Sequence, residues 1–232
     1  MKRFYEEVAT GEAAGGWQVL LDGRAVKTAG KAAQVVPSLA LAEALAAEWA
    51  AQGETIDPAS FPIRDLADYA IDIAGPSRST VIAAILRFAE SDTLCYRADP
   101  DEALFARQRL VWEPLVLAAE ARWDIRFVRV SGVIHQPQPR ATLARLEAVL
   151  GELDAASLAA LHTLASLAAS LIIGLAALAP DAEPQTLWQA SELEEAWQAE
   201  LWGRDAEAEA RQALRFRTFA AAMRFAGLVG QF

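Results

Sequence analysis

Three side chains have the chemistry for nucleophilic or acid–base catalysis. Cys95 is the only cysteine of the chain, and His135 and His162 are its only histidines. A cysteine becomes a nucleophile when a base or cation nearby lowers its pKa, a role that either histidine could fill. Cys95 stands between Leu94 and Tyr96, which is typical of a small core residue. We therefore interpret Cys95 as a core residue and His162 as a hydrogen-bonded core or interface residue.

Other catalytic and ligand-binding signatures are missing. The sequence contains no GxxxxGK[ST], no GxGxxG after a strand, no HExxH and no GxSxG motif. One cysteine and two histidines are too few soft ligands for a zinc cage, so we expect no metal and no cofactor. Carboxylate pairs stay possible in any acidic chain. A small-molecule enzyme that uses carboxylates and Cys95 is therefore an alternative.

The stretch ELEEAWQAELWGRD, residues 192–205, predicts a helix with one carboxylate out of place. Glu194 falls inside the apolar half of the helical wheel, one turn before Gln198. Such a carboxylate either pairs with an arginine of its own domain or lies at the rim of a partner-binding groove. The apolar half also holds Leu187, Ala190, Leu193, Trp197, Leu201 and Trp202, while Glu192, Glu195 and Glu200 fall outside it.

Helices are expected to position most of these residues. Much of the 54% hydrophobic content is alanine, which favours helix and adds little burial. Ser38 is the expected N-cap of the first helix, which ends at Gly53. A later helix carries Gln108 and Trp112 and is interrupted or restarted near Pro114. The predicted helices are 39–52, 78–91, a middle one running towards Trp123, 140–150, 154–178, 184–202 and 205–228.

The first sixty residues predict a β-rich region. Apolar and polar residues alternate from Trp17 to Leu21, and Asp22-Gly23 is the strongest short signal for a two-residue hairpin turn. A further strand is expected to end at Pro37, and residues 55–65 read as a connector. The prediction is an α+β fold: a β-rich domain over residues 1–57, with a hairpin, further strands and one helix, and a helical domain over residues 58–232.

The seven tryptophans are the main candidates for binding anchors. We assign core packing to most of them, Trp49 and Trp112 included. Tryptophan is also enriched at binding hot spots. A late helix that carries Trp188, Trp197 and Trp202 beside acids could therefore be a binding surface.

Charge and hydropathy exclude some partners. The net charge of −10 argues against nucleic acid. We expect the protein to be located in the bacterial cytoplasm, because it has a single cysteine and its first residues, MKRFYEEVATGE, do not resemble a secretory signal. The uncharged span Leu158–Ala179 is long enough to cross a bilayer, so a membrane-associated protein is a second alternative. Its serines and His162, without a flanking Lys/Arg bias, favour the central helix of a bundle and no stable membrane insertion.

Seven motifs resemble one known family when they are taken in order. They are RFYEEV, GGWQVLLDGRAVKT, VPSLALAEALAAEW, DYAID, SDTLCYRA, QRLVWEP and LEEAWQAELWG, and they span almost the whole chain. In this order they are similar to the assembly chaperones of the alpha subunit of F-type ATP synthase. The resemblance is to this family and not to the separate chaperone of the beta subunit.

This resemblance implies a chaperone without enzymatic activity. Family members bind the newly made alpha subunit, prevent its aggregation and release it to beta, and eukaryotic relatives act in the mitochondrial matrix. The resemblance marks Glu194 as functionally important and Trp49 as sensitive to substitution. With Glu194 we expect Gln198, Trp202 and Trp197 to contact the client. The chain departs from the family in three places: Ala29 replaces a common proline, Phe61 a methionine, and Trp197 a frequent tyrosine.

Overall fold

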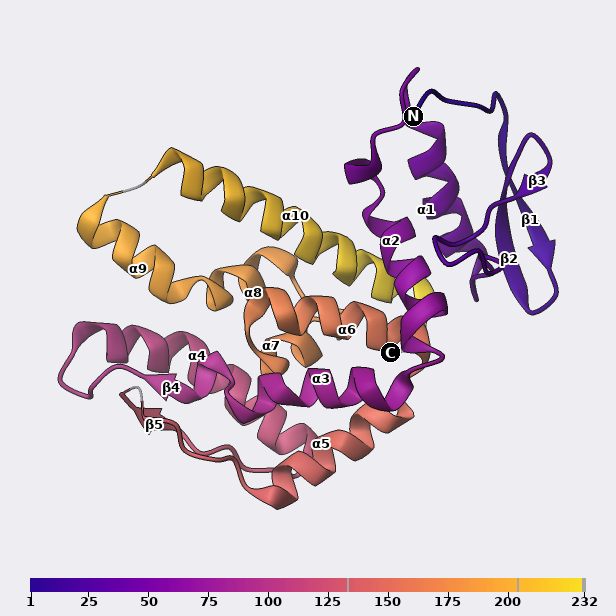
Figure 1. Cartoon of the computed structure of the whole chain (residues 1–232). Helices are drawn as coiled ribbons and strands as arrows, with labels where there is room; N and C mark the ends of the chain where they lie inside the picture. The colour runs from indigo at the N-terminus through magenta and orange to yellow at the C-terminus, as the bar shows by residue number, and fades with distance from the viewer. Residues whose placement is uncertain (133, 204, 231–232) are drawn as a thin grey trace. The chain divides into compact units, whose positions relative to one another are not determined.

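The protein is described by a computed structural model that covers residues 1–132, 134–203 and 205–230. The chain forms two compact units, each described here by itself (Figure 1). Unit 1 comprises residues 1–78, 154–160 and 221–232, and unit 2 comprises residues 79–153 and 161–220. A three-stranded antiparallel sheet followed by a mainly helical chain confirms the α+β prediction. The domain boundary after residue 57 stays a prediction.

Unit 1 begins with a sheet in the order β1-β2-β3 (β1 Val8–Ala13, β2 Gly16–Leu21, β3 Arg24–Ala25). The predicted hairpin joins β2 to β3, with φ of 48° at Asp22 and 75° at Gly23, the positive values that a two-residue I′ turn requires. The Asp22 carboxylate also accepts hydrogen bonds from the backbone N–H groups of Glu7 and Glu6, which lower its pKa. The prediction of a strand that ends at Pro37 is wrong, because residues 33 and 36 make only isolated bridges.

Helix α1 (Leu39–Ala50) packs against this sheet with its buried residues Leu41, Leu45 and Trp49. Ser38 is its N-cap as predicted, because the Ser38 hydroxyl oxygen accepts from the N–H of Leu41 at 3.1 Å. Three short elements follow α1 in unit 1: the 3-10 helix η1 (Pro58–Ser60), helix α2 (Pro62–Tyr69) and the π-helix η2 (Ala70–Ala74).

Two aspartates one helical turn apart, Asp68 and Asp72, hold the turn over residues 28–34. Asp72 accepts from the N–H of Gly30 at 2.8 Å, and Asp68 accepts from the N–H of Ala29 at 3.0 Å. A Cβ at position 30 would lie 2.7 Å from the Asp72 carboxylate, so a larger residue there would force this carboxylate to shift. The DYAID motif therefore fixes the chain that follows the hairpin.

Unit 2 is a set of helices with one short parallel strand pair, β4 (Tyr96–Arg97) with β5 (Val130–Ser131). Helix α4 runs without a break through Pro114, so the predicted interruption there is wrong. The helices wholly or largely in this unit are α3 (Arg78–Glu90), α4 (Ala103–Trp123), α5 (Arg140–Glu152), α7 (Leu171–Ala176), α8 (Pro184–Ser191) and α9 (Leu193–Trp202). Helices α6 (Ala155–Ala168) and α10 (Ala206–Val229) have residues in both units.

The helix predicted over residues 154–178 is broken into α6 and α7. Ala169 adopts a left-handed φ of 48°, and the Ser170 hydroxyl caps the new helix by accepting from the N–H of Ile173 at 3.1 Å. Asp92, fully buried, accepts from the N–H of Ile172 at 3.0 Å. The distant Asp92 carboxylate thus stabilises the start of α7. Across the described residues, no helix combines the length and apolar character needed to cross a membrane.

Candidate functional site

Helix α4 holds the late helices α8 and α9 through two buried side chains. The indole N–H of Trp112 donates to the backbone carbonyl of Ala190 at 2.7 Å. The side-chain amide of Gln108 donates to Glu194 Oε1 at 2.6 Å, and its Oε1 accepts from the N–H of Ala98 at 2.8 Å. Trp112 and Gln108 are both fully buried. These contacts fix where α9 begins.

Glu194 is half-buried, and the side chain that donates a hydrogen bond to it, Gln108, is neutral. Burial raises the pKa of Glu194; the hydrogen bond from Gln108 opposes this shift, and the nearby charge of Glu195 adds to it. No cation contributes to the shift of the Glu194 pKa within the described part of the chain. The internal arginine considered from the sequence is therefore replaced by Gln108. An ionised Glu194 keeps a negative charge that no neighbour neutralises, which suits it to attract a basic group on a partner.

The single helix predicted over residues 184–202 is divided at Glu192. This residue leaves helical geometry at φ −98° and ψ 16° and ends α8 where α9 begins. Its carboxylate was expected to face solvent but is buried, accepting from Gln212 Nε2 at 2.8 Å and lying 3.4 Å from Arg215 Nη1. Burial raises the pKa of Glu192, while Gln212 and Arg215 oppose the shift. Because the break at Glu192 changes the direction of α9, a single helical wheel drawn through α8 and α9 puts several residues on the wrong side.

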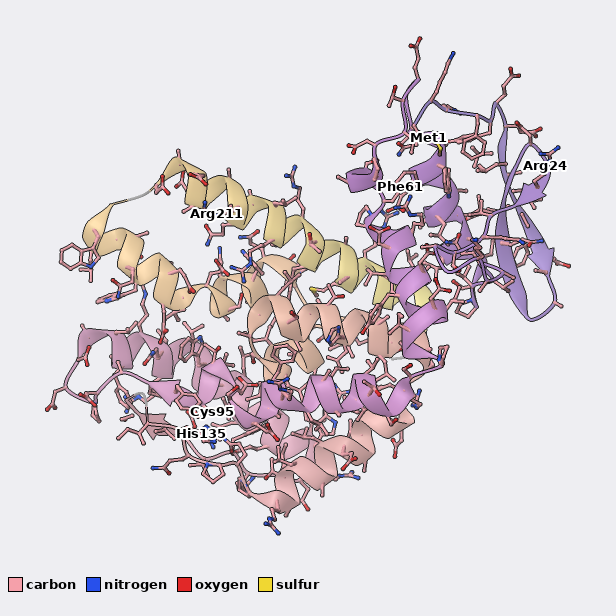
Figure 2. All side chains as sticks on the ribbon, viewed as in Figure 1. Met1, Arg24, Phe61, Cys95, His135 and Arg211 are labelled. Carbon is pink, nitrogen blue, oxygen red and sulfur yellow. The ribbon has the colours of Figure 1, made fainter. Side chains whose placement is uncertain are left out.

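A groove of about 640 Å³ lies between α9 and the first part of α10. Gln198 and Trp202 line it from α9, and Arg211 and Arg215 line it from α10. Arg211 is labelled on α10 in Figure 2. Trp202 is 82% exposed, and Leu201 beside it is also exposed, although both were placed in the apolar half of the predicted helix. Residue 204, part of the stretch singled out in the sequence, lies outside the described residues.

The other predicted client residue, Trp197, faces α4. The guanidinium of Arg107 lies 5.4 Å from the Trp197 ring centroid, and Arg107 Nη1 lies 2.7 Å from Glu200 Oε2. The four predicted residues thus lie on two sides of α9, Glu194 and Trp197 beside α4 and Gln198 and Trp202 beside α10. Sequence reasoning missed Gln108 and Arg107, although the QRLVWEP motif begins at Gln108.

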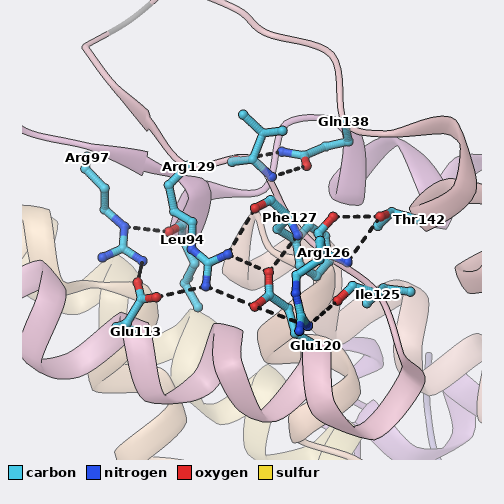
Figure 3. A network of polar contacts seen from close by, with 11 residues as sticks. Leu94, Arg97, Glu113, Glu120, Ile125, Arg126, Phe127, Arg129, Gln138 and Thr142 are labelled. Carbon is cyan, nitrogen blue, oxygen red and sulfur yellow. Dashed lines mark hydrogen bonds and ion pairs between the residues drawn. The ribbon is translucent and has the colours of Figure 1, made fainter.

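Five charged side chains on and beside α4 form one polar network: Arg97, Glu113, Glu120, Arg126 and Arg129 (Figure 3). Glu113 accepts from Arg97 at 3.2 Å and from Arg129 at 2.8 Å. Glu120, which is buried, accepts from Arg129 and from the N–H of Phe127. Burial alone would raise the pKa of Glu120, but the bonds from Arg129 and Phe127 outweigh it and leave the pKa lowered. The network joins α4 to β4 and to the segment around β5, and so fixes the orientation of α4.

The residues considered for catalysis do not form a catalytic group. Cys95 is fully buried, and burial raises the pKa of its thiol, which disfavours the thiolate. His135 Nδ1 lies 3.0 Å from the Tyr96 hydroxyl at the surface, and burial lowers the pKa of His162. The core interpretation of Cys95 is confirmed. In residues 1–132, 134–203 and 205–230 no cluster of three or more His, Cys, Asp or Glu could hold a metal.

Comparison with known families identifies the family of this chain. The family model described as ATP12 chaperone protein matches residues 2–120 of the 232. The chain belongs to the ATP12 chaperone family. Membership makes it part of a family of ATP synthase assembly chaperones and favours binding over catalysis.

Solved structures agree with membership of the ATP12 family. Atp12 from Paracoccus denitrificans is 39% identical, with a TM-score of 0.92 over 98% of each chain. A substituted form of the same protein gives 39% identity and a TM-score of 0.92 over 98% of this chain and 97% of that one. Atu1473 from Agrobacterium tumefaciens, described as a proposed chaperone, is 39% identical, with a TM-score of 0.93 over 98% of this chain and 85% of that chain.

Proposed function

We propose that this ATP12-family chaperone binds the unassembled alpha subunit of F-type ATP synthase, prevents its aggregation and releases it to the beta subunit. In this proposal the protein acts in the bacterial cytoplasm. The observation that carries the proposal concerns helix α9. It bears Glu194, a half-buried carboxylate whose hydrogen-bond partner Gln108 is neutral and beside which the described residues place no neutralising cation, and it ends in the exposed Trp202. Both features are costly or unusual for a helix that contacts only water.

The chemistry of α9 suits a client that must later be released. An unassembled subunit exposes an apolar surface intended for its neighbour, and an indole can cover part of it. Charge pairs between partners direct association and selectivity more than they add affinity. A surface that combines Trp202 with Glu194 can therefore recognise the client without preventing displacement by beta.

The direct test measures aggregation of purified alpha subunit by light scattering, with stoichiometric chaperone and no nucleotide. The proposal expects scattering to be suppressed by the chaperone and alpha to pass into a beta-containing complex when beta is added. Unchanged aggregation would contradict the alpha-specific part of the proposal.

Glu194→Gln is expected to weaken alpha binding about tenfold while the thermal midpoint changes little. A glutamine at this position keeps an oxygen that can accept from Gln108, so the link between α4 and α9 survives, but the charge offered to the client is lost. Binding can be measured by titration calorimetry or surface plasmon resonance, and stability by thermal unfolding.

Glu195→Gln is the matched control. It removes the same charge from the next residue of α9, which is exposed, and leaves Gln108 and its bond untouched. Equal binding by the Glu194 and Glu195 variants would argue for a general charge effect. A large fall in the midpoint for Glu194→Gln would instead assign Glu194 to the fold.

A further inference from the structure

Helix α4 exposes a continuous apolar face on the side away from its buried residues. At a rotation of about 100° per residue, six exposed residues point within about 40° of the direction of Leu110 around the helix axis, Leu110 itself included. We call them the α4 stripe: Ala103, Ala106, Leu110, Pro114, Leu117 and Ala121. The stripe extends for about 27 Å along the helix, at a rise of about 1.5 Å per residue.

The α4 stripe inverts the usual amphipathic pattern. The buried side of α4 carries the polar Gln108 and the charged Glu120 together with Trp112, whereas the exposed stripe is apolar. Leu110 is 77% exposed and Leu117 is 52% exposed. Single exposed leucines are ordinary, but aligned apolar residues along several turns mark an interaction surface.

A hollow beside the α4 stripe can receive a side chain from a partner. A cavity of about 480 Å³ opens between α4, α7 and the start of α8, all in unit 2. Leu115, Ala118, Ile172 and Leu187 are among its apolar lining residues. Three charged residues, Arg122, Asp181 and Glu183, also line it. A ridge next to a hollow of this kind is where an interface places its central anchor.

The charges of α4 indicate which partner fits. Its two acidic residues, Glu113 and Glu120, are both bound by Arg129 of the polar network. Of its basic residues, Arg109 and Arg122 are exposed, whereas the exposed Arg107 is already paired with Glu200. In a chain with a net charge of −10, this helix presents an apolar and basic surface, which is complementary to an apolar segment flanked by acids.

From these observations we infer that the α4 stripe binds an apolar, acid-flanked segment of the unassembled ATP synthase subunit, as a second contact beside the surface of α9. This inference rests on the proposed function, because it assigns a further part of the surface to the same client. Within unit 2, the Arg107 guanidinium of α4 lies 5.4 Å from the Trp197 ring centroid of α9, so the helix that carries the stripe contacts the helix that carries the predicted client residues.

The test compares binding of purified alpha subunit to the wild-type chain and to Leu110→Glu and Leu117→Glu, each made separately. Each substitution is expected to weaken binding about tenfold or more, since it places a carboxylate where apolar and acidic client atoms should pack. Leu214→Glu is the matched control, because Leu214 is an exposed leucine of α10 in the same unit. Arg109→Glu should slow association, with an effect that fades at high salt.

The outcomes separate this inference from the proposed function. Binding by the wild type that persists unchanged in both leucine variants overturns the inference alone, whereas a wild type that does not bind alpha overturns both. If the stripe instead binds a second copy of this chain, the wild type should be a dimer that Leu110→Glu converts to a monomer. That result would also overturn the inference. If Leu110→Glu unfolds, Leu110→Ala, which keeps the helix propensity, carries the comparison.

Discussion

Replacing Trp49 with arginine is expected to lower the free energy of unfolding by about 4 kcal/mol or more, since loss of a buried tryptophan alone costs about 3–5 kcal/mol. Trp49 is only 8% exposed, and its ring lies 4.7 Å from that of Phe61 and 5.6 Å from that of Tyr5 between centroids. The guanidinium of Arg64 already lies 6.0 Å from the Trp49 ring, so a second arginine would add a like charge in a buried place.

The measurement is thermal or denaturant unfolding of the variant, with Trp202→Arg as its control. Trp202→Arg makes the same chemical change at a tryptophan that is 82% exposed, so its stability should stay within about 0.5 kcal/mol of the wild type. A Trp49→Arg variant with a midpoint close to that of the wild type would contradict the core role of Trp49. A milder Trp49→Phe should fold, and it removes an indole N–H that finds no acceptor among the described residues.

Asp92→Ala is the second substitution with a large expected effect, about 4 kcal/mol of unfolding free energy. It would leave the buried N–H groups of Leu94 and Ile172 without their acceptor, and each such loss costs about 1–3 kcal/mol. The break between α6 and α7 would also lose its support, so hydrogen exchange at the start of α7 should become faster. Unchanged exchange there would show that Ser170 alone is sufficient to begin the helix.

The same carboxylate makes stability depend on pH. Burial raises the pKa of Asp92 to about 6, against the opposing hydrogen bonds from Ile172, Ser170 and Leu94. The folded state therefore holds the proton more tightly than the unfolded state, whose aspartate has a pKa of about 3.9. The resulting stability is fully present below about pH 4 and is lost as the pH rises through about 6, by about 3 kcal/mol in all.

Asp92→Asn provides a reference without this titration. The stability of the wild type minus that of Asp92→Asn should be about 2 kcal/mol larger at pH 4.5 than at pH 7, because other groups titrate alike in both. Denaturant unfolding at the two pH values measures it. A difference of the opposite sign would mean that the hydrogen bonds to Asp92 outweigh its burial and that the carboxylate is ionised in the fold.

Features that depend on neighbouring residues were predictable from the sequence. The hairpin follows from Asp22-Gly23, because the turn needs positive φ at both places, and the start of α1 follows from the hydroxyl of Ser38. Helix α3 begins at Arg78 as expected. Each of these signals lies within a few residues of the feature that it controls.

The breaks in the later helices depend on side chains far along the chain. Ala169 and Ser170 continue an apolar helical pattern, and only Asp92, brought close by the fold, supplies the acceptor that starts α7 anew. Glu192 looks like a surface residue until Gln212 and Arg215 of α10 meet its carboxylate. Conversely, α4 passes through Pro114, since its flanks are held by Trp112 and the polar network.

The candidate site was half predictable for the same reason. Helical periodicity alone marks Glu194 as a carboxylate on the wrong side, and the structure places it half-buried against α4. Its partner, Gln108, is 86 positions away in the sequence and has a neutral amide, which no charge pattern reveals. The exposure of Trp202 likewise depends on the turn at Glu192.

The burial of Cys95 has a practical consequence for mapping client contacts. Its thiol is fully buried and its pKa is raised, so it reacts slowly with maleimides and other thiol-specific reagents. Because it is the only native cysteine, Leu110→Cys or Trp202→Cys would introduce the one fast-reacting thiol of the folded protein. A fluorophore or photocrosslinker attached there would report contacts of α4 and α9 separately, without any need to remove the native cysteine.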